Sequence, residues 1–208
     1  GKTCYAASGY LTTEKPAETA AASGQNAEAG SSASASQSAG EVGLNMDWKY
    51  ASMSKINSGK AVLYRSESSA RKNKVVCVNA GHGTKGGSSV KTQCHPDGTP
   101  KVTSGTTSAG ATTAVAVSGG MTFADGTPEA KVTLAMAKVL KDKLLARGYD
   151  VLMIRESDDV QLDNVARTVL ANNLADCHIA LHWDSTKSNK GAFYMSVPNV
   201  ASYRAMEP

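Results

Sequence analysis

Two histidines and one glutamate are the residues of this sequence best suited to hold a catalytic metal ion. His82 lies in a Gly-His-Gly turn directly after the apolar run VVCVNA, and His182 lies near the end of the run HIALHW. Glu129 lies at the start of a helical pattern. Neutral imidazole nitrogens and a carboxylate oxygen are ligands that catalytic zinc takes, with a fourth position left for water. The three residues are therefore candidates for a zinc site.

Each candidate ligand also has a purely structural interpretation. A lone histidine at a strand end is more often a hydrogen-bonded structural residue, and a glutamate in the first helical turn often interacts only with the helix dipole. The flanking Gly81 and Gly83 would let the backbone turn sharply and let a bulky substrate approach. The residue types and their spacing leave both interpretations open.

Strands that alternate with helices are expected to position these residues. Continuous apolar runs predict buried strands over residues 75–80, 149–154 and 178–183, with a fourth over 191–197. This alternation indicates an α/β fold with a largely parallel sheet, whose strands end at one edge. Open sheets place their sites at that edge, where we expect all three candidates.

The helix that carries Glu129 is predicted over residues 127–148. Thr127 suits its cap, Pro128 its first position and Gly148 the left-handed position that ends it. Its apolar stripe would be Val132, Met136, Val139, Leu140 and Leu144. A second helix is predicted from the spacing of Leu162, Val165, Ala166, Val169 and Leu170.

Three segments differ in composition. Residues 1–42 are rich in Ala, Ser, Gly and Glu, which predicts a flexible linker and a possible membrane or lipid anchor upstream. Residues 43–73 form an accessory segment, with a short helix that turns Trp48, Met53 and Ile56 inward and a strand in KAVLYRS. Residues 74–208 form the main domain, with a Gly/Ser/Thr-rich insertion over 84–126.

Composition limits the class of partner. The chain has 208 residues, a formal net charge of +4 and 5% aromatic residues. Nucleic-acid binders more often show a dense basic stripe or an aromatic stacking platform, so no nucleic-acid partner is expected. No run approaches the roughly 18 apolar residues of a transmembrane helix. A weak attraction to an anionic polymer such as a bacterial wall fits the charge.

The cysteines give no support for a thiolate zinc cage, because none of the four forms a CxxC pair. Cys77 and Cys177 lie in apolar runs, where cysteine usually behaves as a small buried hydrophobe. The spacing leaves the disulfide state of Cys4, Cys77, Cys94 and Cys177 open.

Several motifs in order resemble the zinc-dependent N-acetylmuramoyl-L-alanine amidases, which are cell-wall hydrolases. They are VVCVNAGHG, the helix led by Glu129, DVLMIRESDD, and LDNVARTVLANNLADCHIALHWDS, within residues 74 to about 197. The resemblance implies that His82, Glu129 and His182 bind Zn²⁺ and that peptidoglycan is the partner. It also implies a three-layer α/β fold, with a twisted, mostly parallel sheet flanked by helices.

The chain departs from the family pattern at three places. Asn79 stands where the family often has an aspartate, and the 84–126 insertion, a lid or a surface loop, lengthens the segment between His82 and Glu129. The family also carries a second essential glutamate on a late strand. Glu207, in AMEP, does not match that setting, so the expected glutamate would lie beyond Pro208, or the chain is a degenerate homologue. The catalytic proton-transferring residue is therefore unknown.

Other polar residues receive secondary assignments. His178 shares a strand face with His182 and is expected to be a core or supporting histidine, and His95 is a weaker candidate for a fourth ligand.

Arg155 could contact substrate carboxylates, but an ion pair with Asp158 or Asp159 is favoured. Asp163 and Arg167 are four residues apart in a helical pattern, which predicts a surface pair of little consequence.

The function expected from the resemblance is hydrolysis of the amide bond between N-acetylmuramic acid and L-alanine of the stem peptide, in the extracellular space or cell envelope. Two alternatives stay open. One is a wall-binding or regulatory module without catalysis, and the other is a zinc peptidase that cuts within the stem peptide.

Overall fold

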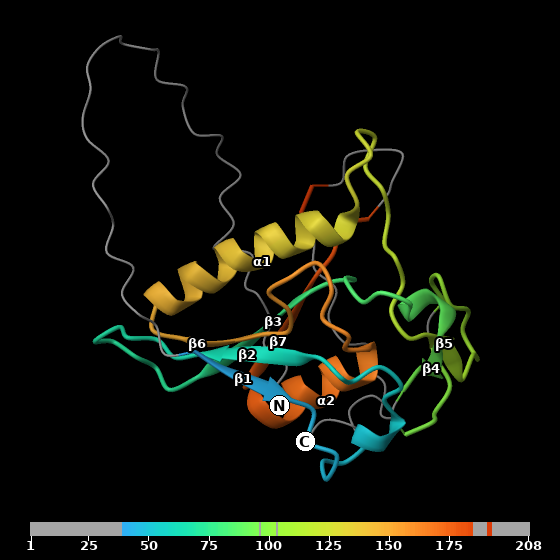
Figure 1. The fold of residues 1–208 in the computed structure, drawn as a ribbon, viewed down its shortest axis with the longest axis horizontal. Coiled ribbons are helices and arrows are strands. Elements are labelled where there is room, and N and C mark those ends of the chain that lie inside the picture. Colours follow the sequence, from blue (N-terminus) through green and yellow to red (C-terminus); the bar gives the residue numbers. More distant parts are fainter. Residues whose placement is uncertain (1–38, 96, 103, 185–190, 193–208) are drawn as a thin grey trace.

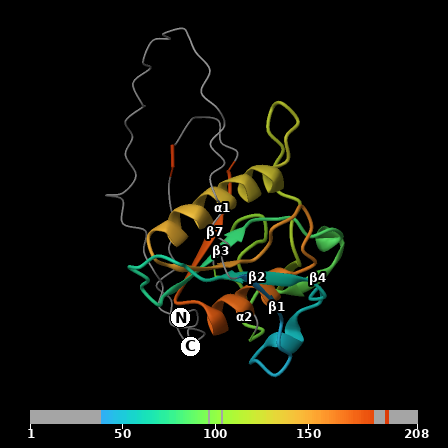
Figure 2. The same cartoon turned by 60° about the vertical axis from the view of Figure 1, so that its left-hand side comes forward.

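The computed structural model describes residues 39–95, 97–102, 104–184 and 191–192. In this part of the chain a five-stranded sheet lies between two helices (Figures 1 and 2). Helix α1 (Glu129–Ala146) covers one face of the sheet and α2 (Asn164–Leu174) covers the other. The predicted three-layer α/β class is confirmed. The helices described include none that is both long and apolar enough to cross a bilayer.

The sheet is mixed, with its parallel strands in the half that carries the candidate site. Strands β3 (Val75–Ala80), β6 (Asp150–Met153) and β7 (Cys177–Leu181) are parallel, with β3 in the middle. Strands β2 (Lys60–Tyr64) and β1 (Ala39–Gly43) then add in antiparallel order beside β6. Three of the predicted strands are thus confirmed; the fourth, over 191–197, lies outside the described residues apart from its first two.

Alternation along the central strands builds two cores. Val76, Val78 and Ala80 of β3 face α1, while Cys77 between them faces α2. In β6 the same alternation places Val151 and Met153 on the α1 side, opposite Leu152 on the α2 side. Because both faces are covered by helices, these strands carry runs of consecutive apolar residues (75–78 and 151–153) rather than apolar residues at every second position.

The buried face of α1 matches the predicted stripe only in part, since Leu140 and Leu144 pack against the core as predicted. Its buried residues include Thr133, Leu134, Ala137 and Leu145, whereas Met136 and Val139 are 47% and 52% exposed. The short side chains of Thr133 and Ala137 let the helix approach the sheet closely, and a search for large apolar residues overlooks them. The N-cap is Pro128, without a side-chain cap, so Thr127 is not the cap. Gly148 is left-handed (φ 86°) just past the end, as predicted.

The N-terminal segments are more integrated than predicted. The end of the predicted linker, residues 39–42, belongs to β1, and the rest of the linker lies outside the described residues. The predicted strand in the accessory segment is confirmed as β2, a member of the main sheet. The predicted helix there is a single 3-10 turn (Ala51–Met53) that buries Ala51, while Met53 is exposed.

The 84–126 insertion contains its own two-stranded antiparallel sheet. Strand β4 (Lys91–Gln93) pairs with β5 (Thr113–Val115), and a 3-10 turn at Gly87–Ser89 precedes them. Figure 1 shows this small sheet beside the main one. The insertion therefore has regular structure of its own and returns to the main domain before α1.

A buried carboxylate ties the α1–β6 connection to β2. Asp150 accepts hydrogen bonds from Arg71 Nε (2.9 Å), Arg65 Nη1 (2.8 Å) and the Ser66 amide (2.9 Å). The bond from Arg71 holds the pKa of Asp150 well below its ordinary value; burial opposes this shift, while Arg65 and Ser66 add to it. The ionised form is therefore the one that the fold stabilises.

We predict that Asp150 gives the fold a specific sensitivity to acid. Because its pKa is depressed in the folded state, its contribution is complete above about pH 5 and is lost as the pH falls below about 4. Urea unfolding should show the wild type losing more stability between pH 6 and pH 3 than Asp150→Asn, which is less stable at pH 6. The exposed Asp142→Asn should behave as wild type, and parallel losses in all three proteins would contradict this assignment.

Candidate metal site

His82 is placed by the turn that follows β3. Its backbone is left-handed (φ 64°), between Gly81 and Gly83. Its Nδ1 lies 2.8 Å from the Ser118 carbonyl oxygen. A carbonyl only accepts hydrogen bonds, so Nδ1 carries the proton and donates it. In the neutral ring this leaves the lone pair of Nε2 directed at the other two candidates.

Glu129 is the first residue of α1 and is buried. Its Oε1 accepts from the Trp183 amide (2.8 Å) and its Oε2 from the Met121 amide (2.9 Å). Burial acts to raise the pKa of Glu129, but these two amides and the His82 ring outweigh it, so the pKa lies below its ordinary value. Glu129 is thus held as an anion.

His182 directly follows β7, and its side chain is 52% exposed. Because β3 and β7 are paired in parallel, the residues after their carboxyl ends meet at one edge of the sheet. Burial of the ring and the neighbouring His82 lower the pKa of His182, in spite of the opposing Glu129. A lowered pKa favours the neutral imidazole, which is the form that binds metals.

The three side chains converge through one atom each. His82 Nε2 lies 2.9 Å from Glu129 Oε1, and His182 Nδ1 lies 3.1 Å from each of these atoms. Ligands about 2.0–2.1 Å from a tetrahedral zinc are about 3.3 Å apart. Two nitrogens and one oxygen in a nearly equilateral triangle of this size fit such an ion, and the half-exposed side of His182 leaves solvent access. The group can therefore hold a metal ion.

Two glycines leave the room that this cluster occupies. A Cβ on Gly81 would collide with the His182 ring. A Cβ on Gly120 would lie 2.7 Å from His82 Cδ2 and 2.8 Å from Glu129 Oε2, and the backbone there is also left-handed (φ 81°). Both positions therefore require glycine on steric grounds, and Gly120 requires it on conformational grounds as well.

The inserted segment takes part in the site through its last residues. Ser118 and Met121 supply the carbonyl and the amide that contact His82 and Glu129. Sequence reasoning missed both, since a backbone contact leaves no signature in residue type. The glycine pair at 119–120, between Ser118 and Met121, is the sequence feature consistent with a close approach.

The structure corrects the prediction for Arg155. Its side chain is fully buried and donates to backbone carbonyls, including Ala80 O (3.0 Å) and Gly81 O (2.9 Å). It therefore has no surface for a substrate carboxylate, and neither Asp158 nor Asp159 lies within ion-pair distance in the described residues. Burial lowers the pKa of Arg155, an effect that Asp158 partly offsets.

Asp163 and Arg167 are also buried, not a surface pair. Asp163 caps α2 by accepting from the Ala166 amide (2.8 Å), and it also accepts from Ser54 Oγ (2.9 Å). Arg167 donates to His82 O (2.7 Å) and lowers the cost of the left-handed turn there. Burial lowers the pKa of Arg167 to about 10, with a further contribution from Arg155. Helical spacing alone could not distinguish these two buried residues from an exposed ion pair.

The remaining histidines lie outside the cluster. His178 Nε2 lies 3.3 Å from Asn79 Nδ2, and Asn79 Oδ1 accepts from Arg167 (3.2 Å), so Asn79 contacts no candidate ligand. His95 Nδ1 instead lies 3.0 Å from Thr99 Oγ1 in the insertion. His95 is not among the described residues that could hold a metal together. Cys77 and Cys177 are buried, as predicted, and Cys77 and Cys94 have free thiols.

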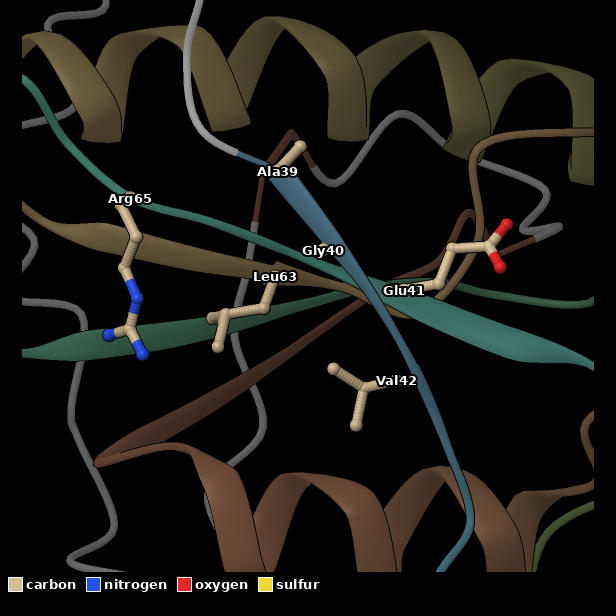
Figure 3. Close-up of a pocket in the computed structure, with 6 residues that line it drawn as sticks. All are labelled: Ala39, Gly40, Glu41, Val42, Leu63 and Arg65. Carbon is tan, nitrogen blue, oxygen red and sulfur yellow. The ribbon is translucent and has the colours of Figure 1, made fainter.

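A shallow cavity of about 330 Å³ lies over β1 and β2, at the edge of the main sheet opposite β7 (Figure 3). It is lined by Ala39, Gly40, Glu41, Val42, Leu63 and Arg65. No histidine or cysteine lines it, and β6 and β3 separate β2 from the strand that precedes His182. The functional site is therefore assigned to the His82–Glu129–His182 cluster.

The fold and the cluster define an α/β protein with a group able to hold a metal ion at the carboxyl edge of its parallel strands. The family model of the N-acetylmuramoyl-L-alanine amidases matches residues 76–204. The chain belongs to this family, which supports a peptidoglycan amidase activity in general. Neither the curated proteins nor the solved structures gave a significant match.

We predict that Gly120→Ala weakens metal binding, since the added Cβ would press on His82 and Glu129. The affinity for zinc, measured by competition with a chelator, should fall by at least about 10-fold, the range found when groups that orient a ligand are disturbed. The neighbouring Gly119→Ala is the matched control, because nothing lies within 4 Å of its Cβ position. Equal affinities for the two variants would contradict the geometry described above.

Proposed function

We propose that this protein hydrolyses the amide bond between N-acetylmuramic acid and L-alanine of the stem peptide, with Zn²⁺ held by His82, Glu129 and His182. The observation on which the proposal rests is the triangle formed by His82 Nε2, Glu129 Oε1 and His182 Nδ1, with sides of 2.9–3.1 Å. Family membership supplies the substrate class and favours a location in the cell envelope or outside the cell.

A bound zinc ion supplies Lewis-acid chemistry, since it polarises a carbonyl oxygen and acidifies water. The protein residues prepare that chemistry. The Ser118 carbonyl fixes the tautomer of His82, so that the unprotonated nitrogen faces the cluster. The amides of Met121 and Trp183 keep Glu129 ionised and fix the direction of both its oxygens.

Glu129 is better suited to hold a metal than to transfer protons. Both of its oxygens accept backbone hydrogen bonds, and its pKa lies below the ordinary value, whereas a general acid or base works best with a pKa near the operating pH. His182 is the most exposed of the three side chains, which places solvent access on its side of the cluster.

Activity on a muramyl-peptide substrate tests the proposal. The wild type with zinc should release intact stem peptide with a free L-alanine amino group. His82→Ala and His182→Ala should lose bound zinc and slow hydrolysis by at least about 10³-fold, since Lewis-acid stabilisation is worth several kcal/mol. His95→Ala, which removes a histidine outside the cluster, should retain zinc and activity.

The products separate this proposal from its alternatives. Single amino acids among the products would indicate a peptidase acting within the stem peptide. Binding to peptidoglycan without any cleavage would indicate a wall-binding module. Retention of zinc at its original stoichiometry after all three ligand replacements would refute the metal site itself.

A further inference from the structure

The buried guanidinium of Arg155 joins the two elements that carry His82 and Glu129. Its Nε donates to Ala80 O (3.0 Å) and its Nη2 to Gly81 O (2.9 Å), both in the segment that leads to His82. The same Nη2 lies 2.6 Å from Ala130 O, in the residue after Glu129. One planar group thus spans both ligand-bearing segments.

Thr133 closes this connection from the side of the helix. Its Oγ1 accepts from Arg155 Nη2 (3.0 Å) and donates to Gly81 O (2.9 Å). Thr133 is fully buried, one turn after Glu129 in α1. The hydroxyl therefore makes a second bridge between α1 and the turn that holds His82.

The turn needs such support, because the backbone conformation that it requires at His82 is not one that a histidine prefers. His82 is left-handed (φ 64°), a costly conformation for a residue with a side chain. The neighbouring Gly83 is left-handed as well (φ 72°), and a Cβ there would lie 2.6 Å from Arg155 Cζ. The turn therefore packs so closely against the Arg155 guanidinium that neither can move without displacing the other.

No carboxylate contacts the Arg155 guanidinium among the described residues. Its other acceptor is Ser157 O (2.8 Å), so all five of its hydrogen-bond partners are uncharged oxygens. A buried arginine that donates only to carbonyls and a hydroxyl contributes direction and rigidity at fixed positions, because its planar fork is pre-organised. Two of these acceptors, Gly81 O and Ala130 O, lie one residue from His82 and Glu129 respectively.

We propose that Arg155 and Thr133 are positioning residues that set the distance between the His82 and Glu129 ligand atoms, and thereby the affinity and coordination geometry of the metal site. The inference rests on the metal site of the proposed function. It adds the residues that fix the relative positions of the ligands in that site. Neither residue contacts the metal ligands' donor atoms.

The test replaces the Thr133 hydroxyl with minimal change of shape. Thr133→Val should lower zinc affinity by about 10-fold and shift the visible absorption spectrum of the Co²⁺-substituted protein, because outer groups that orient ligands affect affinity by about 10–100-fold. Thr133→Ser keeps the hydroxyl and should retain the wild-type affinity and spectrum. Thr168→Val, at a partly exposed threonine whose hydroxyl donates to Asn164 O within α2, controls for the substitution itself.

A second pair of variants tests the contact between Arg155 and the turn that carries His82. Gly83→Ala would press on the guanidinium, whereas Gly86→Ala meets nothing within 4 Å and has a similar positive φ (77°). The Co²⁺ spectrum should change in Gly83→Ala and not in Gly86→Ala. This pair decides the question if Thr133→Val fails to fold.

Two results would overturn the proposal. One is a Thr133→Val protein that melts at a lower temperature but keeps the wild-type zinc affinity and Co²⁺ spectrum, which would make the role merely structural. If the wild type binds neither Zn²⁺ nor Co²⁺, the proposed metal site is wrong. The positioning role is then tested on the metal-free protein. The His82 imidazole signals in ¹H–¹⁵N spectra should then move in Thr133→Val and not in Thr133→Ser; unchanged signals in both would refute the positioning role.

Discussion

Three electron-rich atoms within about 3 Å of one another are the constraint on which the rest of this structure depends. His82 Nε2, Glu129 Oε1 and His182 Nδ1 come from two strand ends and one helix start. Such atoms approach one another only when a proton or a cation lies between them, and only when their backbones are held firmly. The parallel pairing of β3 and β7 brings the two histidines together, and the packing of α1 on the same sheet adds the glutamate.

Buried charges that pair with backbone atoms provide most of this firmness. Arg155 and Arg167 saturate the carbonyls of the turn around His82, and Asp163 caps α2 while it also binds the 54–56 segment. Each group avoids the penalty of an unpaired buried charge by taking several hydrogen bonds. Apart from the Asp150 network at the start of β6, the buried charges described above therefore lie around the candidate metal site.

Residue types at the ends of apolar runs were enough to predict the ligand-bearing elements, because strands buried on both faces have a clear signature. The run VVCVNA predicts β3 in this way, whereas the helix after Pro128 is predicted by its end residues and its apolar spacing. The roles of Arg155, Asp163 and Arg167 could not be predicted, since their spacing fits an exposed face as well as a buried one. The buried face of α1 was predicted only in part, because the small residues Thr133 and Ala137 face the sheet together with the leucines, while Met136 and Val139 are exposed.

Main-chain atoms of Ser118, Met121 and Trp183 contact His82 and Glu129, although the Ser118 hydroxyl also lies 3.2 Å from His82 Nδ1. Evolution can therefore exchange the side chains at these positions while the hydrogen bonds persist. A deletion or an added residue between 118 and Glu129 would be far more damaging, because it would move a carbonyl and an amide out of register together. Related sequences should accordingly drift in composition along this stretch but keep its length.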